Sequence, residues 1–229
     1  YSYLELSNRS FEKKIKDSIE NKNIHGLNIT IPFKQKIMKH VNVFDTHSKK
    51  INAVNCVSIK STVFGANTDW EGYYKTLPKI KNIKKKEVLI IGYGGAALAI
   101  HYVLLKKGFK KIHIVNRTKK KISFVKKTEY TKLTNTIGKY LKTANIIINT
   151  TPTNPIDQKN KKLINKNVLL SDIVYYPKET PFLKSFPYNK KIYGIEMLLE
   201  QAALCFKLWF GFIPKADPEL KRILNNKIK

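Results

Sequence analysis

Cysteine is scarce in this chain of 229 residues. The two cysteines, Cys56 and Cys205, lie far apart, and neither stands in a Cys-x-x-Cys or histidine spacing typical of a zinc site. We therefore expect neither a metal site nor a disulfide framework. A chain with so few cysteines fits a reducing compartment, which favours a cytoplasmic protein.

Signals for a membrane are also lacking. Residues 88–105 contain no acidic residue, lysine or arginine, but Gly92, Gly94 and Gly95 divide this apolar stretch into a strand and a helix. The N-terminus, from Tyr1 to Leu6, has no signal-peptide pattern and begins as though inside a strand. We expect no membrane partner, and we expect further residues upstream of Tyr1.

Acidic residues are outnumbered, because 44 lysines and arginines face 16 aspartates and glutamates, which gives a formal net charge of +28. Such a charge suggests nucleic acid, whose binding would weaken steeply with added salt. Lysine supplies nearly all of the charge and is spread along the whole chain, whereas arginine occurs only at positions 9, 117 and 222. Because no aromatic-basic platform or recognition motif accompanies the charge, we expect no nucleic-acid partner.

Two groups of elements are expected, separated by the polar segment 78–86. In the first group, Ser10 has the character of an N-cap for an amphipathic helix that ends near Glu20. The pattern then predicts a strand at 24–30 that Pro32 ends, an amphipathic stretch at 35–41, a hairpin of 53–60 and 62–66, and a helix at 70–77.

The second group begins with a β-α-β unit made of a strand at 88–91, a helix at 96–107 and a strand at 112–115. Apolar runs at 146–149 and 168–172 predict further strands, and runs of this kind suit a parallel sheet that is covered on both faces. The chain closes with an apolar-rich helix at 197–209 and a short helix after residue 217.

The turn Gly92-Tyr93-Gly94-Gly95-Ala96 lies between a strand and a helix, where glycines let backbone amides approach a pyrophosphate. A tight turn without a ligand is the alternative. After the next strand comes Asn116-Arg117-Thr118, where a site for NAD would usually carry an acidic residue. Arg117, with Lys121 one helical turn further, favours a 2′-phosphate and therefore NADP, although Arg117 is also compatible with an ordinary surface arginine.

Lys34 is the candidate catalytic residue, because it follows a predicted strand and Pro32 and so can face a cleft. Reduction of a carbonyl needs a positive donor, and a carboxylate such as Asp69 can orient that donor and a substrate hydroxyl. Two plainer interpretations stay open: Lys34 as a solvated lysine at the start of the stretch 35–41, and Asp69 as the N-cap of the helix at 70–77.

Taken in order, seven motifs resemble those of the shikimate dehydrogenase family. They are Asn28-Ile29-Thr30-Ile31-Pro32-Phe33-Lys34, Asn52-Ala53-Val54-Asn55, Asn67-Thr68-Asp69, Gly92 to Ala96, Asn116-Arg117-Thr118, Asp172-Ile173-Val174-Tyr175 and Met197-Leu198-Leu199-Glu200-Gln201. The resemblance covers the chain except for the family's N-terminal strand and its paired serines, which hold the substrate carboxylate and would precede Tyr1.

The resemblance implies roles for individual residues. Lys34 is then the catalytic lysine and Asp69 its partner, and the shikimate pocket is lined by Thr30, Asn55, Asp69, Tyr175 and Gln201. Gly92, Tyr93, Gly94, Gly95 and Ala96 would hold the pyrophosphate, Asn116, Arg117, Thr118 and Lys121 the adenosine phosphate, and Ile173 and Gly194 would lie near the nicotinamide. The sequence departs from the family at Asn52 and Trp70, where glycine is common, and at Tyr93, where alanine is usual and where a larger side chain is expected to narrow the approach of the pyrophosphate.

The resemblance implies an α/β enzyme of two domains. A substrate-binding domain at 1–78 is rejoined by residues 195–229, and a Rossmann-type NADP domain spans 79–194. The implied reaction is the reversible NADPH-dependent reduction of 3-dehydroshikimate to shikimate, in the pathway to chorismate and the aromatic amino acids, by a monomer or homodimer. The alternatives are a quinate/shikimate dehydrogenase of broader specificity, a folate-linked dehydrogenase of similar architecture, and a degenerate paralogue that binds ligand without turnover, which the missing serines favour.

Overall fold

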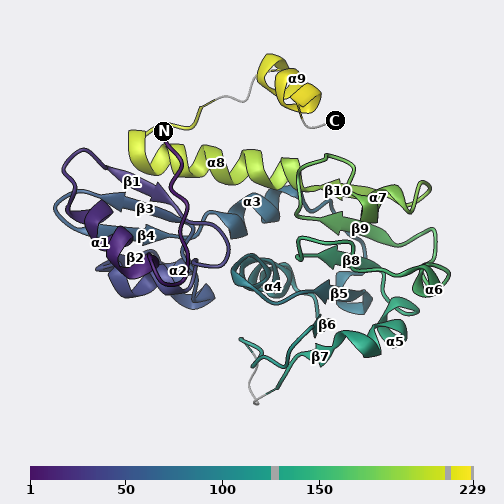
Figure 1. Cartoon of the computed structure of the whole chain (residues 1–229). Coiled ribbons are helices and arrows are strands. Elements are labelled where there is room, and N and C mark those ends of the chain that lie inside the picture. Colours follow the sequence, from purple (N-terminus) through teal and green to yellow (C-terminus); the bar gives the residue numbers. More distant parts are fainter. Residues whose placement is uncertain (125–128, 215–217, 228–229) are drawn as a thin grey trace.

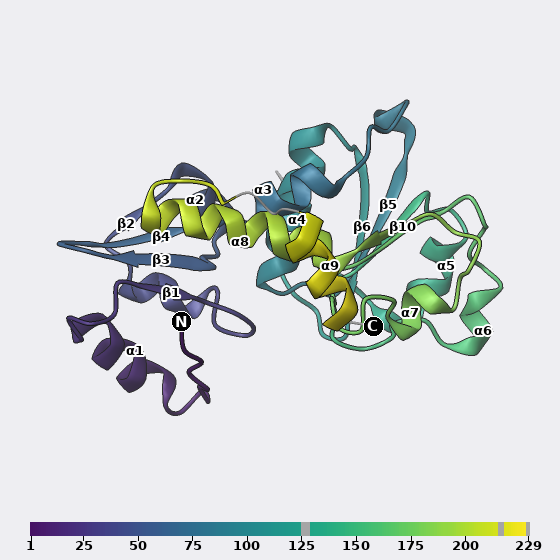
Figure 2. The same ribbon diagram turned by 90° about the horizontal axis from the view of Figure 1, so that it is seen from above.

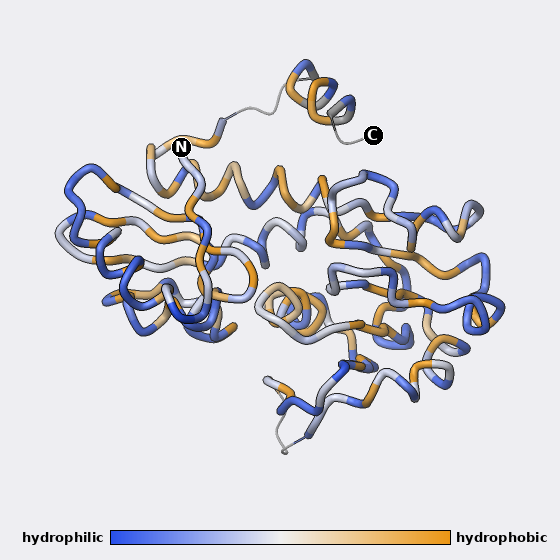
Figure 3. Tube along the Cα trace, in the orientation of Figure 1, coloured by the Kyte–Doolittle hydropathy of each residue, from blue (hydrophilic) through white to orange (hydrophobic). Residues whose placement is uncertain are grey.

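Two β-sheets form the framework of the structure, a computed structural model that describes residues 1–124, 129–214 and 218–227 (Figure 1). Among these residues the first sheet has four strands, in the order β1-β3-β4-β2, and the second has six, in the order β10-β9-β8-β5-β6-β7. Apolar residues concentrate in the strands and in the helices beside them (Figure 3). The prediction of a two-part α/β fold is confirmed.

The first sheet is mixed. Its strands are β1 (Gly26–Asn28), β2 (Val43–Phe44), β3 (Cys56–Ile59) and β4 (Val63–Ala66). Strands β3 and β4 form the predicted antiparallel hairpin, β1 pairs antiparallel with β3, and β2 pairs parallel with β4. The helices of this part are α1 (Phe11–Glu20), the 3-10 helix η1 (Lys36–His40) and α2 (Thr46–Ile51). Phe11 and Ile15 are buried in the core beside β3, because residues four apart lie on one helix face.

The segment between β1 and η1 differs from the prediction. Strand β1 ends at Asn28, well before Pro32, and residues 31–35 form turns, so Lys34 lies in a turn and not at a strand end. Main-chain hydrogen bonds explain this path, because the Ile29 amide donates to the Asn55 carbonyl (2.8 Å) and the Lys34 carbonyl accepts from Val54 (2.8 Å). The stretch expected at 35–41 is the 3-10 helix η1. Ser10 occupies the N-cap position of α1 without a side-chain capping bond.

The second sheet is parallel throughout the described residues. Its strands are β5 (Glu87–Ile91), β6 (Lys111–Asn116), β7 (Lys132–Leu133), β8 (Ile146–Asn149), β9 (Leu169–Asp172) and β10 (Lys191–Tyr193). Numbered from β5, the order is 6-5-4-1-2-3, which is the arrangement of dinucleotide-binding folds, and the chain reverses direction across the sheet between β5 and β8. The sequence did not predict β7 and β10, because both are short and lack an apolar run.

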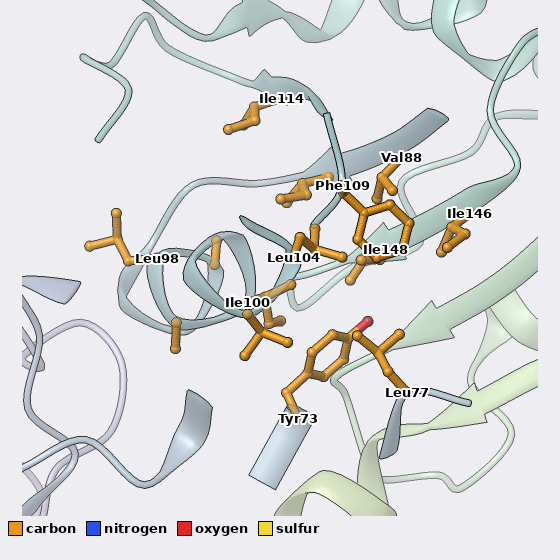
Figure 4. Packing of buried hydrophobic residues seen from close by; sticks show 14 of the residues in the cluster. Tyr73, Leu77, Val88, Leu98, Ile100, Leu104, Phe109, Ile114, Ile146 and Ile148 are labelled. Carbon is orange, nitrogen blue, oxygen red and sulfur yellow. The ribbon is translucent and has the colours of Figure 1, made fainter. Parts of the chain in front are cut away.

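Both faces of this sheet are buried. Val88 and Ile90 of β5 face the cluster that contains α4 (Gly95–Lys107), whereas Leu89 and Ile91 face a second cluster with Phe182. Successive residues of a strand point to opposite faces, which explains why the apolar run is uninterrupted. Figure 4 shows the first cluster, in which Tyr73 and Leu77 lie beside the sheet residues.

The remaining short helices are η2 (Ile83–Lys85), η3 (Thr134–Thr136), α5 (Ile137–Leu141), α6 (Gln158–Lys161) and α7 (Pro181–Lys184).

Helix α8 (Gly194–Phe210) runs from the second sheet back to the first (Figure 2). It packs against α3 (Asp69–Thr76) and reaches β3, where the Trp209 indole donates to the Val57 carbonyl (2.8 Å). Gly72 permits this packing, because a side chain there would meet the Met197 carbonyl oxygen at 3.1 Å. Helix α9 (Pro218–Lys227) follows. Within the described ranges, no helix combines the length and apolarity needed to cross a membrane.

Asn52 has a left-handed backbone conformation at a position where the shikimate dehydrogenase family commonly has glycine. It ends α2 in the left-handed conformation, with φ +59°, and its side chain is exposed. A β-branched residue is strained in this conformation, so Asn52→Val should lower the free energy of unfolding by about 1 kcal/mol. Urea denaturation measures the change. The matched variant Asn52→Gly should stay close to the wild type, and a loss of equal size in both variants would contradict the explanation.

Candidate active site

Lys34 and Asp69 form an ion pair, with the lysine Nζ 2.5 Å from the carboxylate Oδ2. The side chain of Lys34 is 15% exposed and that of Asp69 is 5% exposed, so the alternative interpretation of Lys34 as a solvated lysine is wrong. The N-cap interpretation of Asp69 is wrong as well, because Thr68 holds the cap position and Asp69 is the first residue of α3. The positive end of the helix favours a carboxylate at this place.

Asn55 joins this pair to α8. Its amide Nδ2 lies 3.1 Å from Asp69 Oδ1 and 3.1 Å from Gln201 Oε1, and it also donates to the Thr68 hydroxyl (2.9 Å). Its Oδ1 accepts from the Thr68 main-chain amide (2.6 Å), which fixes the orientation of the Asn55 amide. Gln201 in turn donates to the Leu198 carbonyl (3.0 Å). Residues from three distant parts of the chain therefore meet in one polar cluster, as the motifs predicted.

Thr30 and Tyr175 stand apart from this cluster. Thr30 is exposed in the chain just before the Lys34 turn, and Tyr175, which follows β9, is 46% exposed. Within the part of the chain that the structure describes, no hydrogen bond links either side chain to Lys34, Asp69, or Asn55.

The two cysteines lie beneath the cluster, although they are far apart in sequence. Both are free and fully buried, and Cys205 Sγ is 3.2 Å from the Thr68 hydroxyl. The hydrogen bond with Cys205, followed by burial, raises the pKa of Cys56, so this thiol stays protonated. In the described ranges, no three His, Cys, Asp or Glu side chains gather in a way that could hold a metal ion.

The turn from Gly92 to Ala96, called the glycine turn below, lies against Lys34. A Cβ atom at Gly95 would approach Lys34 Cβ to 2.9 Å, so the start of α4 packs directly on the lysine stem. Gly92 has φ +94°, and a Cβ there would lie 2.5 Å from Thr150 Oγ1. A Cβ at Gly94 would meet nothing within 4 Å, which leaves open space in front of the N-terminus of α4. Ala96 lies in the first turn of this helix, where main-chain amides are free to bind an anion.

Tyr93 does not narrow this space. Its side chain is 5% exposed, and its hydroxyl is 3.0 Å from Nδ1 of His101 on α4. His101 is 3% exposed, and burial lowers its pKa to about 4. The prediction that Tyr93 obstructs the pyrophosphate is therefore wrong, because the ring points into the protein interior.

The segment after β6 lies beside the turn. Asn116 Oδ1 accepts from the Tyr93 amide (3.2 Å), and its Nδ2 donates to the Thr118 carbonyl (2.9 Å). Arg117 and Thr118 are exposed. The segment is not helical, so the prediction that Lys121 follows one helical turn after Arg117 is wrong: Lys121 forms an isolated bridge with Tyr130.

Lys120, which the sequence reasoning missed, donates from Nζ to the Tyr93 carbonyl (3.1 Å). It places a positive charge at the turn, and nothing in the lysine run 119–121 distinguished it from its neighbours. The arrangement fits a phosphorylated dinucleotide, because a helix N-terminus with open space lies beside an exposed arginine and this lysine.

At the ends of β8 and β9, Asn149 and Asp172 form hydrogen bonds to which the sequence analysis gave no role. Asn149 Nδ2 donates to Asp172 Oδ1 (3.1 Å), and the Thr180 hydroxyl donates to Asp172 Oδ2 (2.6 Å). Burial raises the pKa of Asp172. The available signal was their place at the carboxyl ends of parallel strands, where ligands bind in such sheets. The predicted pair Ile173 and Gly194 lies next to them, since a Cβ at Gly194 would meet the Ile173 carbonyl oxygen at 2.5 Å.

Comparison with known proteins identifies the family of this chain. The family model described as the shikimate dehydrogenase substrate binding domain matches residues 1–57, and the model described as shikimate / quinate 5-dehydrogenase matches residues 75–174.

The curated relatives include the shikimate dehydrogenase (NADP(+)) of Methanobrevibacter smithii, 35% identical over 206 residues that cover 82% of this chain and 73% of the relative. That of Oceanobacillus iheyensis is 32% identical over 246 residues, which cover 99% of this chain and 88% of the relative. The crystal structure of shikimate dehydrogenase 1 from Peptoclostridium difficile matches with a TM-score of 0.81 and 26% identity over 99% of this chain and 85% of that one. This chain belongs to the shikimate dehydrogenase family.

Proposed function

We propose that this chain catalyses the reversible NADPH-dependent reduction of 3-dehydroshikimate to shikimate, a step toward chorismate and the aromatic amino acids. One observation carries the proposal: the Lys34–Asp69 pair is held by Asn55 and lies against Gly95 at the start of α4. Lys34 therefore lies both in the proposed substrate pocket and beside the proposed cofactor site. The curated relatives named above carry this activity in their names.

The roles of Lys34 and Asp69 in the reduction follow from their opposite charges. When bound, NADPH supplies the hydride. Negative charge then develops on the substrate oxygen, and the Lys34 ammonium group stabilises that charge and gives up a proton to the oxygen. Asp69 keeps the ammonium group in place and accepts a hydrogen bond from a ring hydroxyl. In the direction of oxidation, Lys34 receives the proton.

A cyclic polyol suits the polar cluster. We propose that Asn55 and Gln201 bind ring hydroxyls through their amides and that Thr30 and Tyr175 complete the pocket when substrate is present. Amide and hydroxyl groups both donate and accept, so they match a hydroxyl-bearing ring.

For the cofactor, we propose that the turn from Gly92 to Ala96 binds the pyrophosphate through the main-chain amides at the N-terminus of α4. Asn116, Arg117, Thr118, Lys120 and Lys121 would surround the 2′-phosphate, and Ile173 and Gly194 would flank the nicotinamide. Support comes from the open space at Gly94 and from the exposure of Arg117. The chain carries no carboxylate in the Asn116 to Lys121 segment to bind the ribose of NAD.

We also propose the domain division given by the motifs, with residues 1–78 and 195–229 binding substrate and residues 79–194 binding NADP. The two separate sheets and the packing of α8 on α3 support it. The two free, buried thiols suit a reducing compartment, which supports a cytoplasmic enzyme. We propose that it acts as a monomer or homodimer.

Replacement of the proposed catalytic lysine tests the function. The wild-type chain should oxidise NADPH with 3-dehydroshikimate and reduce NADP with shikimate in preference to quinate. In Lys34→Met, the turnover number should fall by about two to four orders of magnitude, because the proton donor is lost. Lys39→Met is the matched control, since Lys39 is an exposed lysine in the same region, on η1.

Absorbance at 340 nm follows both directions of the reaction, and circular dichroism checks folding. Turnover that survives in Lys34→Met would refute the role of Lys34. A wild-type chain that binds shikimate without turnover would refute the proposed reaction in favour of the degenerate paralogue.

The cofactor assignment gives a separate prediction for Arg117. Arg117→Gln should raise the KM for NADPH by about tenfold to a hundredfold, because charge-assisted hydrogen bonds to the phosphate are lost. The KM for NADH should change little. Steady-state kinetics with both cofactors measures the effect, and Arg9→Gln, which removes an exposed arginine elsewhere, is the control. Equal effects on the two cofactors would show that Arg117 does not bind the 2′-phosphate.

A further inference from the structure

Tyr93 and His101 form a buried pair for which the proposed chemistry has no use. Tyr93 lies within the glycine turn and His101 lies on α4, and the two side chains are 5% and 3% exposed. A buried hydroxyl and a buried imidazole are costly unless each has partners. Their partners connect them to the segment from Asn116 to Phe124.

Tyr93 takes part in four hydrogen bonds, two through its side chain and two through its main chain. The hydroxyl is 3.0 Å from His101 Nδ1 and accepts from the Ser123 amide at 3.0 Å. The Tyr93 amide donates to Asn116 Oδ1 (3.2 Å), and the Tyr93 carbonyl accepts from Lys120 Nζ (3.1 Å). Tyr93 is thus bonded to Asn116, Lys120 and Ser123, so it contacts the segment 116–123 at three places.

Burial keeps both side chains of the pair uncharged at neutral pH. Burial lowers the pKa of His101 to about 4, so the imidazole is neutral at neutral pH and its Nδ1 can accept. Burial also raises the pKa of Tyr93, which keeps the phenol protonated. The uncharged phenol and the uncharged imidazole therefore share one hydrogen bond, and the phenol oxygen also accepts from the Ser123 amide.

Further contacts fix the segment 116–124. The Thr131 hydroxyl donates to the Thr118 carbonyl (3.2 Å) and accepts from the Lys120 amide (3.0 Å). The Phe124 ring packs against His101, with ring centroids 5.4 Å apart. Arg117 is exposed between Asn116 and Thr118, so its backbone is fixed on both sides while its guanidinium group is free to reach a ligand.

We infer that Tyr93 is a positioning residue for cofactor specificity: together with His101 it holds the segment 116–123 so that Arg117 is arranged for a 2′-phosphate before the cofactor arrives. A segment that must become ordered during binding reduces affinity, and prior order removes that cost. NADH has no 2′-phosphate, so it gains little from this order. The inference rests on the proposed use of a 2′-phosphorylated cofactor.

Tyr93→Phe tests the inference, because it removes only the hydroxyl and with it the bonds to His101 and Ser123. The KM and the dissociation constant for NADPH should rise about threefold to tenfold, as expected for the loss of one or two hydrogen bonds. For NADH these constants should change by less than twofold. His101→Leu should shift the ratio of NADPH to NADH affinity in the same direction.

Tyr73→Phe is the matched control. Tyr73 is another buried tyrosine of the same hydrophobic cluster, and its hydroxyl bonds to Ser171 and not to the phosphate segment. Its loss should leave the ratio of NADPH to NADH affinity unchanged. The inference is overturned if Tyr93→Phe weakens the two cofactors equally or not at all, or if Tyr73→Phe shifts the ratio as much.

Titration calorimetry with NADP and NAD separates this inference from the proposed function. If the wild-type chain shows no turnover, the proposed reaction fails, yet the binding ratio of wild type and Tyr93→Phe still decides the role of Tyr93. If the wild-type chain turns over normally and the binding ratio does not change in the variant, only the inference about Tyr93 fails.

Discussion

The ion pair between Lys34 and Asp69 is the contact around which the two sheets are arranged. Two charges that leave water lose hydration energy, and the loss is compensated only when geometry and additional hydrogen bonds are good. Here the second carboxylate oxygen of Asp69 accepts from Asn55, while 15% of the Lys34 side chain stays exposed. Removal of either partner would leave an unpaired buried charge, so the surrounding packing must keep the turn of Lys34 and the start of α3 together.

Close main-chain contacts provide that packing. Gly95 lets the start of α4 rest on the stem of Lys34, and Gly72 lets α8 approach α3 so that Gln201 reaches Asn55. The hydrophobic cluster that contains Ile90 and Tyr73 continues from the parallel sheet into α3. Elements of both parts therefore share one core, and the position of the glycine turn relative to Lys34 follows from this core.

Much of this was predictable from sequence, for identifiable physical reasons. The run from Val88 to Ile91 predicted a strand buried on both faces, and the glycine turn after it predicted the start of α4, because these signals are local. The turn of Lys34 was mistaken for a strand end, since two main-chain hydrogen bonds with a distant part of the chain decide it: Ile29 donates to the Asn55 carbonyl, and Val54 donates to the Lys34 carbonyl. The direction of the Tyr93 ring and the place of Lys120 depend in the same way on distant partners. Residue identity alone does not reveal such partners.

The central claim is that Lys34 and Asp69 face the reacting oxygen of the substrate at the place where the glycine turn delivers the cofactor. A crystal structure of the chain with NADP and shikimate bound measures this directly. The account predicts that Lys34 Nζ lies within about 3.2 Å of the hydroxyl that is oxidised, with the pyrophosphate in the open space at Gly94. Shikimate bound elsewhere, with neither Lys34 nor Asp69 in contact with it, would contradict the account.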